Sequence, residues 1–274
     1  MQGNPLQQYF RQPKIWVKLP SGGIYNQPNV VQGDVNKLPI FGMTGMDEIL
    51  VKTPDALLSG ESTAKLIESC VPSIKDAWDV ASIDVNLLLI AMRIATYGNM
   101  MSISHKCTKC GTEHEYDVDL GKFVEYFQSC TYENSVKIDD IIVKFKPLTY
   151  RQINELAIKD FRIRKQAAAL LVPENEQGPE QVKPLYKQLL EIQNEIFINS
   201  IESVQVPTAN VTDPEFIKEW VNNCDKDIYQ FVKQQSEKNM DRWSIQPIDV
   251  TCDSCNHSDK VNVDLDYTSF FANA

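Results

Sequence analysis

Two C-x-x-C motifs, far apart in the chain, constrain its fold more than any other feature. Cys107 and Cys110 form the first motif, and Cys252 and Cys255 form the second. A two-residue spacer lets both thiolates of one tight turn bind the same ion, at about 2.3 Å for zinc, and two such turns complete a tetrahedral shell. The sequence therefore predicts one zinc site that joins the two motifs, although 141 residues separate them.

The segments around the two motifs resemble each other. Each residue of the second pair lies 145 positions after its counterpart, and the same offset relates Val118–Leu120 to Val263–Leu265. Each segment has the pattern of a strand, a cysteine turn and a strand, with Gly111 or Asn256 where the backbone can need a positive φ. Two such hairpins around one ion form a zinc ribbon. A long insertion between them is tolerable, because the entropy cost of loop closure grows only logarithmically with length.

The residues leave other interpretations of the cysteines open. Seven cysteines are an odd number, and the first residues show no apolar core of signal-peptide type. We therefore do not expect a framework of disulfide bonds. A redox dithiol fits less well than zinc, because no thioredoxin-like βαβ pattern surrounds either pair. His105 or His257 could replace a cysteine ligand, and a second chain could complete the site. Four cysteines close the coordination shell, so we expect one structural zinc per chain rather than a catalytic one.

The hydrophobic pattern predicts an α+β fold with N-terminal strands and short helices, the zinc ribbon and a set of longer helices. Alternating apolar and polar residues predict strands at 15–19, 136–138, 141–145 and 244–250. Apolar residues three and four apart predict helices at 63–71, 84–97, 149–171, 182–196, 213–221 and 227–237. Asp84 is placed to cap the second of these helices, since its carboxylate can accept the free amides of the first turn.

Three parts of the chain follow from this pattern. Residues 1–14 are polar and contain two prolines, so we expect a flexible arm. Residues 15–146 together with 244–274 form an α+β body that contains the ribbon, because its two halves come from distant parts of the chain. Residues 147–243 form an inserted helical subdomain.

The motifs of common enzymes are missing from the sequence. We find no phosphate loop, no dinucleotide fingerprint, no nucleophile elbow and no H-E-x-x-H, and the three histidines all lie close to the cysteine turns. We therefore expect no catalytic residues, no cofactor-binding residues other than the zinc ligands, no small-molecule substrate and no enzyme. No apolar run approaches the roughly 20 residues of a membrane span, so we expect no membrane partner.

The charge distribution argues against binding to nucleic acid. The formal net charge is −10, whereas affinity for phosphates depends on clustered lysine and arginine. The basic run Lys159–Lys165 is typical of a solvated helix face, although it could meet an anionic partner. Zinc ribbons often serve transcription machinery, so a nucleic-acid adaptor is the competing hypothesis. Acidic residues such as Glu113, Glu115 and Asp253 beside the cysteine turns make a poor surface for phosphates.

An ordered set of segments covers about residues 15–155. The set consists of KLPSGGIY (18–25), LPIFGMTGMDEILVKTPDALLSG (38–60), LIESCV (66–71), DVNLLLIAMRIATYG (84–98), CTKCG (107–111) and FKPLTYRQ (145–152). It resembles the baseplate protein family of T-even-type contractile-tailed phages, which includes proteins of baseplate hub assembly.

The resemblance implies a noncatalytic phage tail protein that is either a hub component or a factor that assembles the hub. Its partners would be other baseplate hub or wedge proteins. Its location would be the host cytoplasm during assembly, or the baseplate of the virion tail. We also expect the strand Ile15–Leu19 to be able to pair with a neighbouring protein by strand addition. The oligomeric state stays open.

Overall fold

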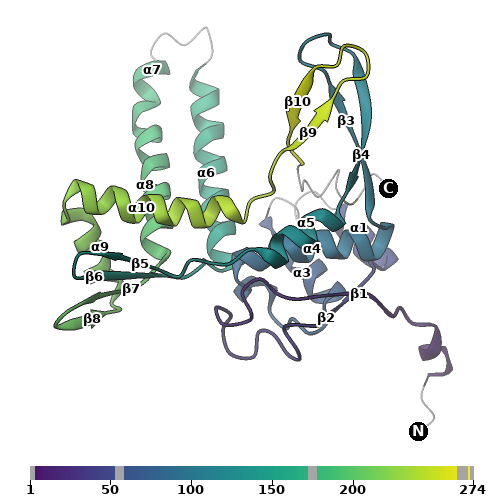
Figure 1. Cartoon of the computed structure of the whole chain (residues 1–274), viewed down its shortest axis with the longest axis horizontal. Helices are drawn as coiled ribbons and strands as arrows, with labels where there is room; N and C mark the ends of the chain where they lie inside the picture. Colours follow the sequence, from purple (N-terminus) through teal and green to yellow (C-terminus); the bar gives the residue numbers. More distant parts are fainter. Residues whose placement is uncertain (1–3, 53–58, 172–177, 264–270, 272–274) are drawn as a thin grey trace. The chain divides into compact units, whose positions relative to one another are not determined.

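The computed structural model of the chain describes residues 4–52, 59–171, 178–263 and 271 (Figure 1). The fold is α+β, with helices and several small antiparallel sheets, as predicted. The chain divides into two compact units. Met1–Cys130 and Trp243–Ala274 form the first unit, and Thr131–Arg242 forms the second. In the part of the chain that the structure describes, no helix combines the length and the hydropathy that a membrane span requires.

Helix α4 (Ser82–Tyr97) forms the centre of the first unit. It carries apolar residues on almost every side, and Leu87 to Met92 are all nearly inaccessible to solvent. A helix that is apolar all round is stable only inside a core. It packs against β1 (Pro13–Val17), β2 (Leu38–Phe41), α3 (Glu61–Cys70) and α5 (Gly121–Ser129). The shorter elements of this unit are η1 (Pro5–Tyr9), α1 (Gly45–Val51) and η2 (Ala77–Asp79).

Asp84 does not cap α4, so that prediction was wrong. The helix begins at Ser82 with Ala81 at the N-cap position, which places Asp84 inside the first turn. Its fully buried carboxylate accepts hydrogen bonds from the backbone N–H and the hydroxyl of Ser21, at 2.8 and 2.6 Å. The side chain therefore fixes the turn Leu19–Gly23 against α4 instead of satisfying the helix's own amides.

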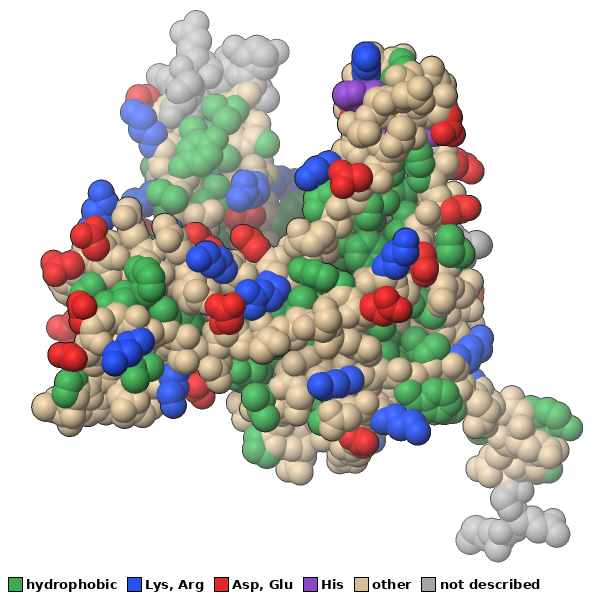
Figure 2. Space-filling view, viewed as in Figure 1, with side chains coloured by type: hydrophobic (Ala, Val, Ile, Leu, Met, Phe, Trp, Pro, Cys, Tyr) green, Lys and Arg blue, Asp and Glu red, His purple; other side chains and the backbone are tan. Residues whose placement is uncertain are grey.

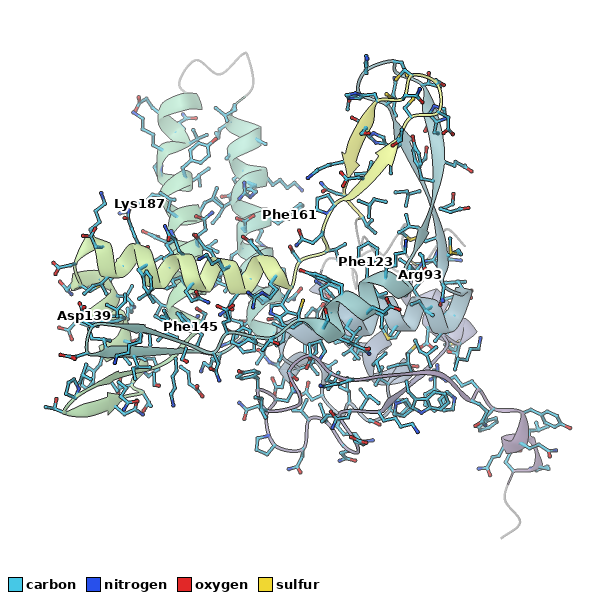
Figure 3. All side chains as sticks on the ribbon, viewed as in Figure 1. Arg93, Phe123, Asp139, Phe145, Phe161 and Lys187 are labelled. Carbon is cyan, nitrogen blue, oxygen red and sulfur yellow. The ribbon has the colours of Figure 1, made fainter. Side chains whose placement is uncertain are left out.

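The second unit combines a four-stranded antiparallel sheet with long helices. The strands lie in the order β5 (Ser135–Ile138), β6 (Ile141–Phe145), β7 (Ile201–Val206) and β8 (Ala209–Val211). The helices are α6 (Tyr150–Leu170), α7 (Gly178–Gln181), α8 (Lys183–Asn199), α9 (Pro214–Asn223) and α10 (Lys226–Arg242). The predicted turn between β5 and β6 is present, with Asp139 at a φ of 47° (Figure 3).

The second unit begins earlier than the expected boundary at 147, and it is not purely helical. Strand β6 pairs with β7, which lies after the first two long helices of the unit. The buried Val143 and Phe145 of β6 pack with Phe197 and Val232 in one core. Because the hairpin β5–β6 shares this sheet and this core, it belongs with the helices and not with the ribbon body.

The two ends of the second unit meet, as the ribbon requires. Arg242 donates hydrogen bonds to the carbonyl oxygen of Thr131 at 2.6 Å and to the Glu133 carboxylate at 2.8 Å. Asn239 donates to the carbonyl oxygen of Glu133 at 2.8 Å. These contacts join the first and last residues of the insertion, so the chain returns close to the point where it left.

Candidate metal centre

Two antiparallel hairpins carry the four cysteines at their turns. The first hairpin is β3 (Met100–Lys106) with β4 (Glu113–Asp119), and the second is β9 (Ile248–Thr251) with β10 (Ser258–Val261). Figure 1 shows the two hairpins side by side, with β3 and β4 in teal and β9 and β10 in yellow. Both belong to the first unit, on either side of the insertion.

The two cysteine turns have the same backbone geometry. In the first turn, the N–H of Gly111 donates to the carbonyl oxygen of Cys107 at 3.0 Å, and the N–H of Cys107 donates to that of Thr112 at 2.9 Å. In the second turn, the N–H of Asn256 donates to the carbonyl oxygen of Cys252 at 2.8 Å, and the N–H of Cys252 donates to the carbonyl oxygen of His257 at 2.9 Å.

The backbone conformation at the expected positions is also confirmed. Gly111 has a φ of +74° and Asn256 has a φ of +53°. In both turns this left-handed residue directly follows the second cysteine, where it reverses the chain. The structural repeat therefore includes the turns themselves. The matching stretch Val263–Leu265 lies only in part inside the described residues, since the structure does not describe Asp264 and Leu265.

The four sulfur atoms form one compact cluster. Cys107 Sγ lies 3.7 Å from Cys255 Sγ, and Cys110 Sγ lies 3.6 Å from Cys252 Sγ. All four sulfur atoms lie within 4.8 Å of one another. Four thiolates at about 2.3 Å from a central zinc ion would stand about 3.8 Å apart, so these distances fit a tetrahedral shell. The sequence-predicted residues come together, and the cluster could coordinate a metal ion.

The pKa values of two cysteines in the cluster shift in opposite directions. Hydrogen bonding with Thr112, whose hydroxyl oxygen lies 3.4 Å from Sγ, lowers the pKa of Cys110 to about 6. The backbone N–H of His257 favours the thiolate of Cys255, but burial and the other three thiols favour its neutral form, and its pKa rises to about 12. A metal ion would have to displace the remaining protons, so its affinity should fall at low pH.

Neither of the histidines next to the cysteine turns lies among the sulfur atoms. His105 Nε2 lies 3.1 Å from Oδ2 of Asp259, and His257 Nε2 lies 3.4 Å from its Oδ1. The backbone N–H of Thr108 also donates to Asp259 Oδ2, at 3.0 Å. The hydroxyl and then the amide of Thr108 hold the pKa of Asp259 far below its usual range. Asp259 thus links the second hairpin to the turn of the first.

His114 of the first hairpin makes the corresponding contact with the turn of the second hairpin. Its Nε2 lies 3.2 Å from the hydroxyl oxygen of Ser254 and 3.4 Å from Cys252 Sγ. His114 and Asp259 each lie seven residues after the first cysteine of their own hairpin, so they hold equivalent positions in the repeat. Sequence reasoning missed this pair, because histidine and aspartate do not look alike. The common offset was the signal that could have found them.

A comparison with models of known families bears on the whole chain. Residues 17–272 match the family described as T4 bacteriophage base plate protein. The chain belongs to this family. The comparisons with curated proteins and with solved structures gave no match.

Membership of the family confirms the resemblance and extends it. The resemblance covered about residues 15–155, whereas the match covers both units and all four cysteines. The chain is therefore a phage baseplate protein, a class that is located in the virion tail and contacts other baseplate proteins.

Proposed function

We propose that this baseplate protein works without catalysis, as a component of the baseplate hub or as a factor that assembles the hub in the host cytoplasm. The observation that carries the proposal is the family match over residues 17–272. The protein acts through contacts with other hub or wedge proteins, and it needs neither a small-molecule substrate nor a nucleic acid.

A structural zinc ion is the second part of the proposal. Cys107, Cys110, Cys252 and Cys255 supply four thiolates, which leave no open coordination position for a substrate or for water. The ion would contribute folding free energy by joining two hairpins that share no strand pairing. Asp259 and His114 support this arrangement, since each holds the turn of the opposite hairpin.

The charge of the ribbon supports a protein partner over a nucleic acid. Glu113, Glu115 and Asp117 point to the exposed face of β4, where successive same-face residues repeat every second position. Their only basic cross-strand partner on this face is Lys106, opposite Glu113. Such a face repels phosphates, so we expect no salt-sensitive binding of the purified chain to DNA. Binding of that kind would favour the zinc-ribbon adaptor.

The zinc site is tested by metal analysis of the purified chain. We expect one zinc ion per chain, and we expect Cys107→Ser and Cys252→Ser each to release it and to destabilise the first unit. Cys130→Ser is the matched control, because Cys130 belongs to the same unit but not to the cluster. Zinc retained in both ligand variants would refute a shared site, and a different metal at full occupancy would refute its identity.

The role in the baseplate is tested by purification of the tagged chain from infected cells at successive times. A hub component should be present both in assembly intermediates and in mature virions. An assembly factor should be present in the intermediates and missing from the virions. Absence of the chain from intermediates and virions alike would overturn the proposed function.

A further inference from the structure

The N-terminal turn η1 exposes apolar side chains and buries none. Leu6, Tyr9 and Phe10 are 60%, 77% and 56% exposed, and no residue of η1 is buried. In Figure 2, green side chains gather on this turn at the lower right, next to the grey N-terminal residues. Single exposed apolar residues are ordinary on a protein surface, but three within five positions make a contiguous apolar group.

The turn is formed before any partner binds. The side-chain oxygen of Asn4 accepts a hydrogen bond from the N–H of Leu6 at 3.0 Å, and Pro5 occupies the first helical position. The N–H of Phe10 donates to the carbonyl oxygen of Gln7 at 3.1 Å. In a 3₁₀-helix, residues three apart lie on the same side, so Leu6 and Tyr9 form one ridge. A preformed turn loses less conformational entropy when it binds.

Arg11 attaches this turn firmly to the first unit. Its guanidinium donates to the carbonyl oxygens of Gly42 and Ser69, both at 2.7 Å, and to the Asp47 carboxylate at 3.3 Å. It also lies over the ring of Phe41, 5.8 Å from the centroid. The contacts hold the chain at residue 11, directly after the exposed turn. The turn therefore has a fixed base, whereas its own apolar side chains stay mostly exposed among the residues that the structure describes.

The chemistry of the turn indicates what would cover it. Residues 4–10 carry no charged side chain, although the chain as a whole has a net charge of −10. A charged groove would lose its hydration against this turn and gain no opposite charge in return. A groove lined by uncharged and apolar residues is the complementary surface.

A second copy of the chain does not offer such a groove among its larger hollows. Three grooves on the described residues have volumes of about 590, 450 and 400 Å³, and they lie between α8 and α10, beside α3, and between α6 and α8. Each of them is lined by at least four charged side chains, such as Lys187, Lys226 and Lys233 in the largest. A smaller groove of about 210 Å³ between α8 and α10, lined by Ile196, Phe197 and Met240 among others, also carries the charges of Lys233 and Glu237. We therefore take the complementary groove to lie on a different protein.

We propose that residues 4–10 are a docking segment that inserts Leu6, Tyr9 and Phe10 into an uncharged apolar groove of another baseplate protein. The inference rests on the proposed function, because it takes the partner from the baseplate. A short helical turn that offers apolar anchors to a groove is a common mode of recognition, and aromatic side chains dominate the binding energy of such contacts. The segment lies before residue 17, where the family match begins.

Photo-crosslinking in infected cells tests the contact directly. The photoreactive amino acid p-benzoylphenylalanine replaces Tyr9 in the full chain, and in a control it replaces Ile24, which is 75% exposed in the same unit. We expect the probe at position 9 to form a cross-link with one peptide of another baseplate protein, rich in uncharged apolar residues, and the probe at 24 to form none there. A cross-link to a second copy of the chain, or the same product from both positions, would overturn the proposal.

A pair of substitutions measures how much the segment contributes. Leu6→Ser combined with Tyr9→Ser should reduce the amount of chain in purified baseplate intermediates at least about tenfold, since aromatic and apolar anchors dominate such interfaces. Ile24→Ser should leave the amount unchanged. Since η1 buries no residue, both variants should keep the circular dichroism spectrum and zinc content of the wild type.

The outcome separates this inference from the proposed function. If the wild-type chain is missing from the intermediates, the proposed function fails. If the wild type is present and the double variant is present in equal amount, the docking segment alone is refuted.

Discussion

The buried carboxyl group of Asp84 should make the stability of the first unit depend on pH. The side chain is fully buried and accepts two hydrogen bonds from Ser21, at 2.8 and 2.6 Å. Burial is the main cause that raises its pKa from 3.8 to about 6, and the hydrogen bonds from Ser21 act in the opposite direction. The negative charge is therefore less stable in the folded protein than in the unfolded chain.

The size and the sign of the effect follow from the two pKa values. The rise from 3.8 to about 6 corresponds to about 3 kcal/mol. Near pH 4 and below, the folded protein carries the neutral carboxyl and keeps the most stability from this group. As the pH rises through the window from about 4 to about 6, the unfolded chain ionises first and the free energy of unfolding falls. Above about pH 6 the loss is complete and constant.

Replacement of Asp84 by asparagine removes this dependence. The amide of Asp84→Asn keeps an oxygen that can accept from the N–H of Ser21, but it does not titrate. The difference in the free energy of unfolding between this variant and the wild type should therefore grow by about 2 kcal/mol between about pH 4.5 and 7.5, in favour of the variant. Asp117→Asn, at an exposed position of the same unit, should follow the wild-type slope.

Urea unfolding followed by tryptophan fluorescence measures this difference. A Trp220→Phe background removes the tryptophan of the second unit, so that the signal comes from Trp16, Trp78 and Trp243 of the first. Both proteins carry the same four cysteines, so any pH dependence of the metal site cancels in the difference. A difference between Asp84→Asn and wild type that stays constant over the whole pH range would refute the reasoning.

Three further predictions test the packing, the insertion and the metal. Gly42→Ala should lower the free energy of unfolding by about 1–3 kcal/mol, measured by thermal unfolding, since a Cβ there would lie 2.9 Å from the carbonyl oxygen of Ala95. Gly45→Ala should not lower it, because a Cβ at this position would have no other atom within 4 Å. Arg242→Ala should destabilise the second unit by about 0.5–1 kcal/mol, because it removes a 2.6 Å hydrogen bond to the carbonyl oxygen of Thr131 at an exposed position, where water can replace the lost donor. Hydrogen exchange at the ends of that unit should rise; unchanged exchange would contradict this. Removal of the metal by a chelator should abolish hydrogen-exchange protection in β3, β4, β9 and β10 and leave the second unit protected, whereas equal loss in both units would show that they unfold together.

The two cysteine turns could be predicted from the sequence because the geometry of each turn is local. Two residues between cysteines fix a tight turn, and the position of Gly111 and Asn256 follows from the same turn. The start of α6, expected at 149, could be predicted equally well, since Thr149 and Gln152 form a capping box within four residues. Each cysteine turn and the capping box are formed by neighbours along the chain, so the spacing of residue types predicts them. The chemistry of a four-thiolate shell then pairs the two turns across 141 residues.

The features that could not be predicted depend on partners far away in the sequence. Asp84 looked like a cap until the structure placed Ser21 against it, 63 positions away. The boundary of the second unit was misplaced, because the pattern of the β5–β6 hairpin does not say which strand it pairs with. Asp259 contacts Thr108 across 151 positions. Local patterns define what a residue can do, but tertiary contacts select one of the possibilities.

The insertion changes the cost of closing the metal site. A simple ribbon closes a loop of about 15–20 residues, and closing a flexible loop of 141 residues would cost about 2 kcal/mol more by the logarithmic law. That extra cost applies only while the insertion is unfolded. Once Arg242 binds the carbonyl oxygen of Thr131, the folded second unit holds its own ends together and acts as a short connection. The second unit should therefore fold without the metal. Once it has folded, the four cysteines should lose less entropy when they gather around the ion.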